Sequence, residues 1–100
     1  MKDITVTEWK SLVAEDDQAV LLDVRTPHEV EEGMIEGALH IDIYKGQGFI
    51  DEVKQLDPLK NYYVYCRSGG RSVQACTLMG QLGFENTYNL LGGYTAWVEA

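Results

Sequence analysis

A nearly continuous apolar run, AVLLDV at residues 19–24, constrains the fold of this chain more than any other feature. Strands that are covered on both faces in a parallel sheet are built from such runs. We therefore interpret residues 19–24 as a central strand of a parallel sheet. A second run, YYVYC at residues 62–66, is the most β-prone stretch of the chain and predicts another strand.

Helix-start signals separate these runs. Thr5 and Glu8 are spaced as a capping box, in which each side chain bonds the other residue's backbone amide. Thr26 and Glu29 repeat the pattern with Pro27 at the first helical position. Further helices are predicted before Pro58 and over about 68–82, with Gly83 at the end of the latter. GALHIDI at 37–43 reads as a strand, and TYNLLGGYTAWVEA at 87–100 reads as a last short strand, a glycine turn and a C-terminal helix.

Strands and helices thus alternate along the chain. This order predicts an α/β fold with three layers, in which a small, mostly parallel sheet is flanked by helices. A length of 100 residues is that of one ordinary domain, so we expect residues 1–100 to form a single domain. Sites in such sheets form at the carboxyl ends of the strands. Asp23 and Arg25 follow one strand and Cys66 ends another, so we expect them to meet on one face.

Charge and composition exclude several classes of function. The net charge is −8, and phosphate contacts need clustered Lys and Arg, so we expect neither nucleic-acid binding nor binding to an anionic membrane. No apolar run approaches the roughly 20 residues of a membrane span. The N-terminus lacks the apolar segment of a secretory signal, which predicts a cytoplasmic protein with two free thiols. We expect a monomer or a weak dimer.

The loop CRSGGRS, residues 66–72, gathers the features that activate a thiol. A thiol reacts as its thiolate, so its pKa must be lowered. Arg67 and Arg71 bring positive charge, the glycine pair lets successive amides point inward, and a helix begins directly afterwards. Each feature alone is more often structural, but together they indicate a nucleophile in an anion cradle. The expected substrate-binding residues are Arg67, Ser68, Gly69, Gly70, Arg71 and Ser72.

Three blocks of the chain resemble the rhodanese-like domain family. CRSGGRS is similar to the family's active-site loop, LLDVRTPHEVEEGMIEGALHI to its D-V-R-x-x-x-E and G-H-I-x-G-A segments, and LLGGYTAW to its closing segment. The resemblance implies a sulfurtransferase in which Cys66 takes sulfur from a donor such as thiosulfate or a persulfide. The sulfur would be held as a cysteine persulfide and passed to a thiophilic acceptor. Met34 stands at the position of the family's histidine.

Two alternatives remain beside sulfur transfer. Phosphatases and arsenate reductases of this fold place five residues between the cysteine and the arginine, whereas four separate Cys66 from Arg71 here. The shorter ring should fit a sulfur better than a tetrahedral oxyanion. The other alternative is a binding or sulfur-carrier module with little turnover. Small-molecule donors and acceptors are expected, and a sulfur-relay protein is a further candidate partner.

The remaining candidates are assigned supporting or structural roles. Asp23 either braces the cysteine loop or serves as a local cap or salt bridge at the strand end, and we expect a supporting role for both Asp23 and Arg25. Cys76 lies roughly 7 Å further along the helix axis than Arg71, beyond the usual disulfide span of about 7 Å once the loop is added, so we expect a core residue. His28 and His40 are not expected to act as a base. We predict no metal site and no cofactor, because no cluster has metal-ligand spacing.

Overall fold

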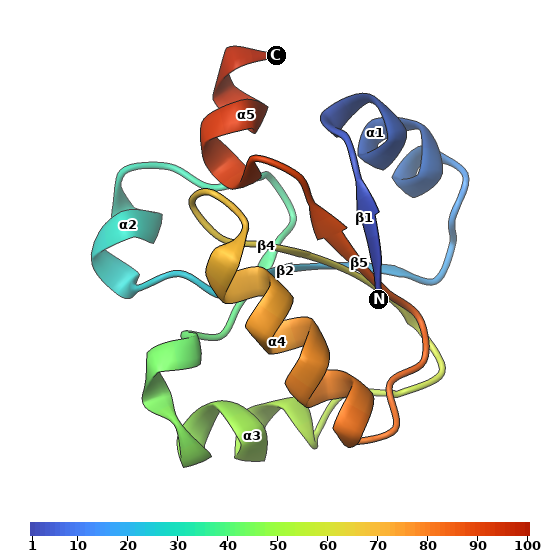
Figure 1. Ribbon diagram of the computed structural model, residues 1–100, viewed down its shortest axis with the longest axis vertical. Helices are drawn as coiled ribbons and strands as arrows, with labels where there is room; N and C mark the ends of the chain where they lie inside the picture. Colours follow the sequence, from blue (N-terminus) through green and yellow to red (C-terminus); the bar gives the residue numbers. More distant parts are fainter.

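The computed structural model describes all 100 residues. Five strands and five α-helices alternate along most of the chain, with one short 3₁₀ helix, η1, between β3 and α3 (Figure 1). In chain order the elements are β1 Lys2–Ile4, α1 Val6–Ala14, β2 Ala19–Asp23, α2 Pro27–Glu31, β3 Leu39–His40, η1 Ile43–Lys45, α3 Gln47–Val53, β4 Asn61–Tyr65, α4 Gly70–Gln81, β5 Thr87–Leu90 and α5 Gly93–Glu99.

The five strands form one sheet in the order β1-β5-β4-β2-β3, and every pair is parallel. The sheet is therefore wholly parallel, where the sequence predicted a mostly parallel one. The predicted run at 19–24 is the penultimate strand β2, between β3 and the central strand β4. In the β2–β4 register Asp23 lies opposite Tyr65, so both strands end at the same edge. This edge carries Cys66 directly after Tyr65.

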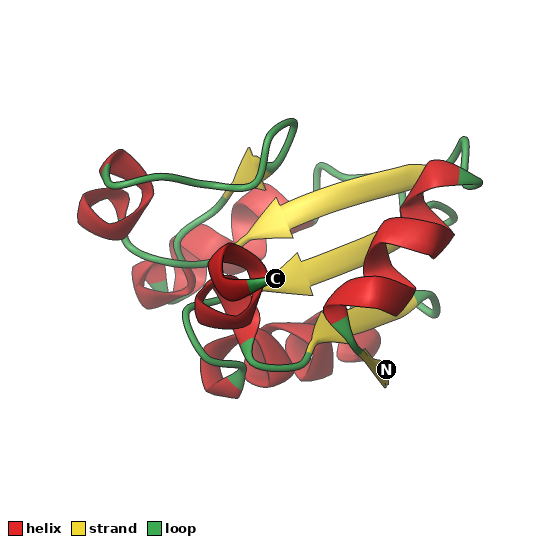
Figure 2. Ribbon diagram, turned by 90° about the horizontal axis from the view of Figure 1, so that it is seen from above, coloured by secondary structure: helices red, strands yellow, loops and turns green.

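Helices cover the two faces of the sheet, as the three-layer prediction required (Figure 2). On one face, Phe49 and Val53 of α3 and Met79 of α4 pack with Leu22 and Val64 of the sheet. On the other face, α1 and α5 lie over a core that includes Trp9, Tyr63, Tyr65 and Leu90. Trp9 meets Trp97 of α5 edge-on, with ring centroids 6.3 Å apart. Burial on both faces explains why β2 and β4 are almost continuously apolar.

Three of the predicted helix boundaries follow capping signals, whereas α3 ends at Val53, earlier than the boundary predicted before Pro58. Thr5 and Glu8 form a complete capping box at α1, and Thr26 and Glu29 form one at α2. At the end of α4, Gly83 adopts φ +95° and the Phe84 amide donates to the Met79 carbonyl at 3.0 Å. This is the Schellman geometry expected of a C-terminal glycine, and Phe84 continues into the core.

Two strands differ from expectation. The strand predicted at 37–43 is only Leu39–His40, because the Asp42 side chain accepts from the Tyr44 amide at 2.9 Å and starts η1. β1 was not predicted, since three residues are too short to show a pattern; it adds the edge strand beside β5. None of the helices combines the length and apolar character needed to cross a membrane.

Candidate active site

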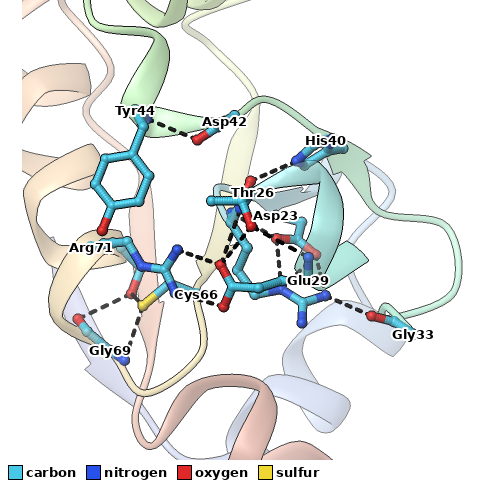
Figure 3. A network of polar contacts seen from close by, with 12 residues as sticks. Asp23, Thr26, Glu29, Gly33, His40, Asp42, Tyr44, Cys66, Gly69 and Arg71 are labelled. Atoms are coloured by element: carbon cyan, nitrogen blue, oxygen red, sulfur yellow. Dashed lines mark hydrogen bonds and ion pairs between the residues drawn. The ribbon is translucent and has the colours of Figure 1, made fainter. Parts of the chain in front are cut away.

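Cys66 lies in the turn between β4 and α4, at the carboxyl edge of the sheet. Gly69 caps α4 with φ +118°, a left-handed conformation that glycine adopts without strain. This conformation folds the loop back over the thiol, so that the Gly69 amide donates to Cys66 Sγ at 3.0 Å (Figure 3). The Cys66 residue is 1 % exposed and forms part of the core beneath α4.

The pKa of Cys66 is lowered from its ordinary value. Burial of the thiol raises the pKa, but hydrogen bonds to the sulfur outweigh burial. They come from the Ser72 hydroxyl, 3.4 Å from Sγ, and from the backbone amides of Ser72, Gly69 and Ser68. The loop is thus a set of convergent donors around one sulfur, the arrangement that stabilises an anion.

The two arginines of the loop make different contacts. Arg71 forms a bidentate pair with Glu29 of α2, with N–O distances of 2.6 and 2.8 Å (Figure 3). The same pair lowers the pKa of Glu29 to about 2. Arg67 is exposed and forms no ion pair. The loop's hydrogen-bond donors are the larger causes of the lowered pKa of Cys66. Arg71, although paired with Glu29, also interacts favourably with Cys66 through charge.

Asp23 and Arg25 form a buried local pair. The Arg25 guanidinium donates to both carboxylate oxygens of Asp23, at 2.8 to 3.1 Å, and to the Gly33 carbonyl at 2.7 Å. It also lies over the Tyr94 ring, 4.4 Å from the centroid. Asp23 makes no hydrogen bond to the cysteine loop, so the local ion-pair alternative describes it. Its role is to hold Arg25 where it ties the end of α2 to the sheet.

The N-terminal end of α5 supports the cysteine loop from the other side. The Tyr94 amide donates to the Cys66 carbonyl at 2.8 Å, and the Thr95 amide donates to the Arg67 carbonyl at 3.1 Å. Gly93 has φ +56°, and a Cβ there would lie 2.5 Å from the Cys66 carbonyl oxygen. Only glycine allows this approach. The GGYTAW segment is therefore part of the loop's support as well as of the core.

Sequence reasoning missed two residues of the site. Glu29 was assigned only to the capping box, yet its carboxylate also holds Arg71. Asn89 of β5 is 2 % exposed and its Oδ1 accepts a hydrogen bond from the Ser72 hydroxyl. A polar residue within the otherwise β-prone run TYNL was the available signal for Asn89. No local signal exists for the Glu29–Arg71 pair, whose members are 42 residues apart.

The other titratable candidates lie outside the thiol site. Cys76 is buried on α4, where burial raises its pKa to about 11, and both cysteines are free. The His28 side chain is exposed and lies 3.5 Å from Glu32, while His40 Nε2 lies 2.7 Å from the Arg25 carbonyl oxygen. No three His, Cys, Asp or Glu side chains are grouped closely enough to hold a metal ion.

Comparison with known proteins agrees with this geometry. The family model described as "Rhodanese-like domain" matches residues 5–100. "Putative sulfurtransferase YtwF" of Bacillus subtilis (strain 168) is 40% identical over 98 residues, covering 97% of this chain and 90% of the relative. A protein named "Sulfurtransferase" from Allochromatium vinosum is 36% identical over 85 residues, 85% of this chain and 77% of the relative. The solved human single-domain sulfurtransferase TSTD1 has a TM-score of 0.80 at 27% identity, covering 99% of this chain and 96% of that structure.

The fold and the site together define a class: a parallel α/β domain that presents a cysteine in a strand-to-helix loop lined with amides. Within that class the chain belongs to the rhodanese-like domain family, as its sequence motifs implied. Sulfur transfer is the general activity that these named relatives support.

Proposed function

We propose that this protein transfers sulfane sulfur from a small donor to a thiophilic acceptor through a persulfide on Cys66. The donor is thiosulfate or a low-molecular-weight persulfide. The observation that carries the proposal is the convergence of the Gly69 amide and the Ser72 hydroxyl on Cys66 Sγ, at 3.0 and 3.4 Å. In this family, the cysteine whose sulfur is surrounded by such donors is the nucleophile.

In the first half-reaction the Cys66 thiolate attacks the outer sulfur of thiosulfate. A bond forms between Sγ and that sulfur, and the bond from the outer sulfur to the sulfonyl sulfur breaks with its electron pair. Sulfite leaves, and the enzyme keeps one sulfur as Cys66–S–S⁻. The negative charge moves from Sγ to the outer sulfur, within reach of the loop's amides, so the same donors stabilise both anions.

In the second half-reaction an acceptor such as cyanide attacks the outer sulfur. The bond between the two sulfurs breaks, Sγ departs as the thiolate, and thiocyanate is released. Because the lowered pKa of Cys66 makes its thiolate a better leaving group, the loop also assists this step. The proposal assigns no general base, because the lowered pKa of Cys66 favours the reactive thiolate.

The exposed Arg67 is the proposed docking point for an anionic donor. It lines a surface depression of about 370 Å³ together with Arg25, Tyr94 and two carboxylates, Glu29 and Glu32; Cys66 itself does not line this depression. Of the three arginines, Arg67 alone has no carboxylate partner, so its charge is free to meet a sulfonate. The acceptor is proposed to reach the same sulfur once the donor has left.

Two-substrate kinetics test this proposal. With thiosulfate and cyanide as substrates, ping-pong behaviour with parallel double-reciprocal lines is expected, because the donor's product leaves before the acceptor binds. Cys66→Ser should form no thiocyanate above the uncatalysed rate, whereas the matched Cys76→Ser variant should retain most of the activity. Thiocyanate formation by Cys66→Ser at the wild-type rate, or intersecting lines, would contradict a Cys66 persulfide.

A further inference from the structure

A chain of polar contacts leads from the thiol to the edge of the sheet. Cys66 Sγ lies 3.4 Å from Ser72 Oγ, the Ser72 hydroxyl donates to Asn89 Oδ1, and Asn89 Nδ2 donates to Asp3 Oδ1 at 3.0 Å. The last contact crosses the β1–β5 pair, in which Asp3 and Asn89 are register partners. Ser72 and Asn89 are 0 % and 2 % exposed, whereas Asp3 is exposed. Nothing in the proposed half-reactions uses Asn89 or Asp3.

The Ser72 hydroxyl has one hydrogen and three acceptors within reach. They are Asn89 Oδ1, the Gly69 carbonyl oxygen at 3.1 Å, and Cys66 Sγ whenever the thiol is ionised. A neutral thiol needs no hydrogen from Ser72, because it can donate its own to Oγ. A thiolate needs one. The hydroxyl must therefore leave its other acceptors to stabilise the thiolate fully.

Asp3 determines which end of the Asn89 amide faces Ser72. An ionised carboxylate only accepts hydrogen bonds, so the amide NH₂ of Asn89 must point to Asp3. Oδ1 is then directed at Ser72, where it competes with the thiolate for the single hydroxyl hydrogen. If the amide were free to turn, its NH₂ would face Ser72 Oγ instead, and the competition would end.

We propose that Asn89, oriented by Asp3, is a positioning residue that draws the Ser72 hydroxyl away from the Cys66 thiolate. The relay consists of Asp3, Asn89 and Ser72. The relay makes the thiolate less stable than it would be with the hydrogen bonds of the loop and no relay. It does not destabilise the persulfide form, because Sγ is then neutral and the Ser72 hydroxyl donates to Asn89. The effect of the relay on thiolate stability is argued from the geometry alone, whereas its effect on sulfur transfer rests on the proposed function.

Few other charged groups act on the thiol. On α4, Arg71 and the Cys76 thiol interact with Cys66 through charge, and Arg71 is already paired with Glu29. Arg67 follows Cys66 but is exposed. From β1, Asp3 reaches the site through Asn89. A change at Asp3 could therefore act through the relay or directly through its charge, and the experiment must separate the two.

The test is the midpoint of Cys66 alkylation against pH, read by peptide mass so that Cys76 is scored separately. Asp3→Asn removes the charge but keeps the size of an exposed side chain, and it frees the Asn89 amide to turn. We expect the Cys66 midpoint to fall by about half to one pKa unit, the effect of one hydrogen bond no longer shared. Asp3→Ala should shift the Cys66 midpoint in the same direction, and it replaces Asp3→Asn in the test if that variant folds poorly.

Two controls separate the relay from simple charge. Asp17→Asn removes an equal charge before β2, at the opposite end of the strands from the thiol, and should leave the midpoint unchanged. In a Ser72→Ala background, Asp3→Asn should no longer move the midpoint, because the hydroxyl that carries the effect is absent. An equal shift with and without Ser72, an equal shift in Asp17→Asn, or no shift in Asp3→Asn and Asp3→Ala would each overturn the proposal.

The consequence for sulfur transfer is measured separately. Because nucleophilicity falls with thiol pKa, Asp3→Asn should take up sulfur about two- to threefold more slowly above the midpoint, and should deliver it to cyanide faster by a similar factor. Unchanged rates of both half-reactions despite a shifted midpoint would overturn the part of the proposal that concerns sulfur transfer. Alkylation needs no sulfur donor, so a protein that fails to take up sulfur but shows the midpoint shift refutes the proposed function and keeps the relay.

Discussion

At the scale of single residues, the lowered pKa of Cys66 depends mainly on the hydrogen-bond donors of the loop. The Ser72 hydroxyl and three backbone amides lower the pKa of Cys66 against the effect of burial. Arg71, the nearest cation on α4, is held by Glu29. A thiolate stabilised in this way depends on the loop's conformation and is little affected by salt, because buried hydrogen bonds are screened far less than exposed charges.

Ser72→Ala tests the largest of these hydrogen bonds. Removing the hydroxyl should raise the pKa of Cys66 by about one unit, since a hydrogen bond to a charged group contributes about 1.5 kcal/mol or more and one unit corresponds to about 1.4 kcal/mol. Because the thiolate is the reactive form, alkylation below the midpoint should slow about tenfold. The measurement is the rate of alkylation by iodoacetamide across pH.

The matched control is Ser68→Ala. Ser68 contributes its backbone amide, which alanine retains, and its side chain is exposed. This variant should titrate like the wild type. If the two serine variants shift the midpoint equally, the hydroxyl of Ser72 has no special part in ionisation, and the assignment fails.

The sequence singled out Cys66 as the candidate nucleophile, and it indicated only part of the surroundings that the structure gives this thiol. Cys66, the glycine pair and the following helix are neighbours in the chain, so local pattern was sufficient for them. Glu29 and Asn89 reach the site through the packing of α2 and β5 against α4. Such contacts depend on which elements become neighbours in space, and no local pattern encodes that. The Glu29 partner of Arg71 was not predicted for the same reason, since it lies on another helix.

At the scale of elements, α5 holds the cysteine loop through one close backbone approach at Gly93. An alanine there would place Cβ 2.5 to 2.6 Å from backbone atoms of Cys66 and Arg67, at a φ of +56°. We expect Gly93→Ala to lower the free energy of unfolding by about 3 kcal/mol or more, because backbone strain and overpacking combine. Chemical denaturation measures this, and sulfur uptake should fall with it.

Gly80→Ala is the control for that substitution. Gly80 is exposed within α4, and a Cβ there would meet no atom within 4 Å. Alanine in an open helical position should raise the free energy of unfolding by about 0.5 to 1 kcal/mol. A Gly93→Ala protein as stable as the wild type would show that α5 can move away from the loop without cost.

A second contact between elements ties α2 to α4 through Glu29 and Arg71. The folded pKa of Glu29 is about 2, below its ordinary value of 4.5. The pair therefore stabilises the fold fully above about pH 4.5 and loses this contribution as the pH falls toward 2. Both side chains are about one-fifth exposed, at 20% and 22%, so we reduce the full linkage value and expect a contribution of about 1 to 2 kcal/mol.

Glu29→Gln should lose that stabilisation at pH 7, and its difference from the wild type should shrink below pH 4.5. Denaturant titrations at several pH values give the comparison. Glu32→Gln, whose side chain is 75% exposed beside His28, should show no measurable change at neutral pH. A difference between Glu29→Gln and the wild type that is independent of pH would mean that the carboxylate charge is not what stabilises the pair.

At the scale of the whole molecule, the wholly parallel sheet brings the ends of β2 and β4 to one edge and leaves the cysteine loop between α4 and α5. Alternating strands and capped helices were enough to predict this architecture. The edge strands were predicted less well: β1, with three residues, was missed, and β3 has only two residues where a strand was predicted at 37–43. So short a strand is defined by its neighbour rather than by its own sequence. The site lies at the centre of the sheet, where prediction was strongest.

The central claim is that one sulfur atom is carried on Cys66, and intact-protein mass spectrometry tests it most directly. After incubation with thiosulfate and removal of the donor, the protein should gain the mass of one sulfur, and cyanide should remove it. Cys76→Ser should behave in the same way and Cys66→Ser should gain nothing. A labile sulfur that persists on Cys66→Ser, or no gain by the wild type from thiosulfate or any persulfide donor, would contradict the account.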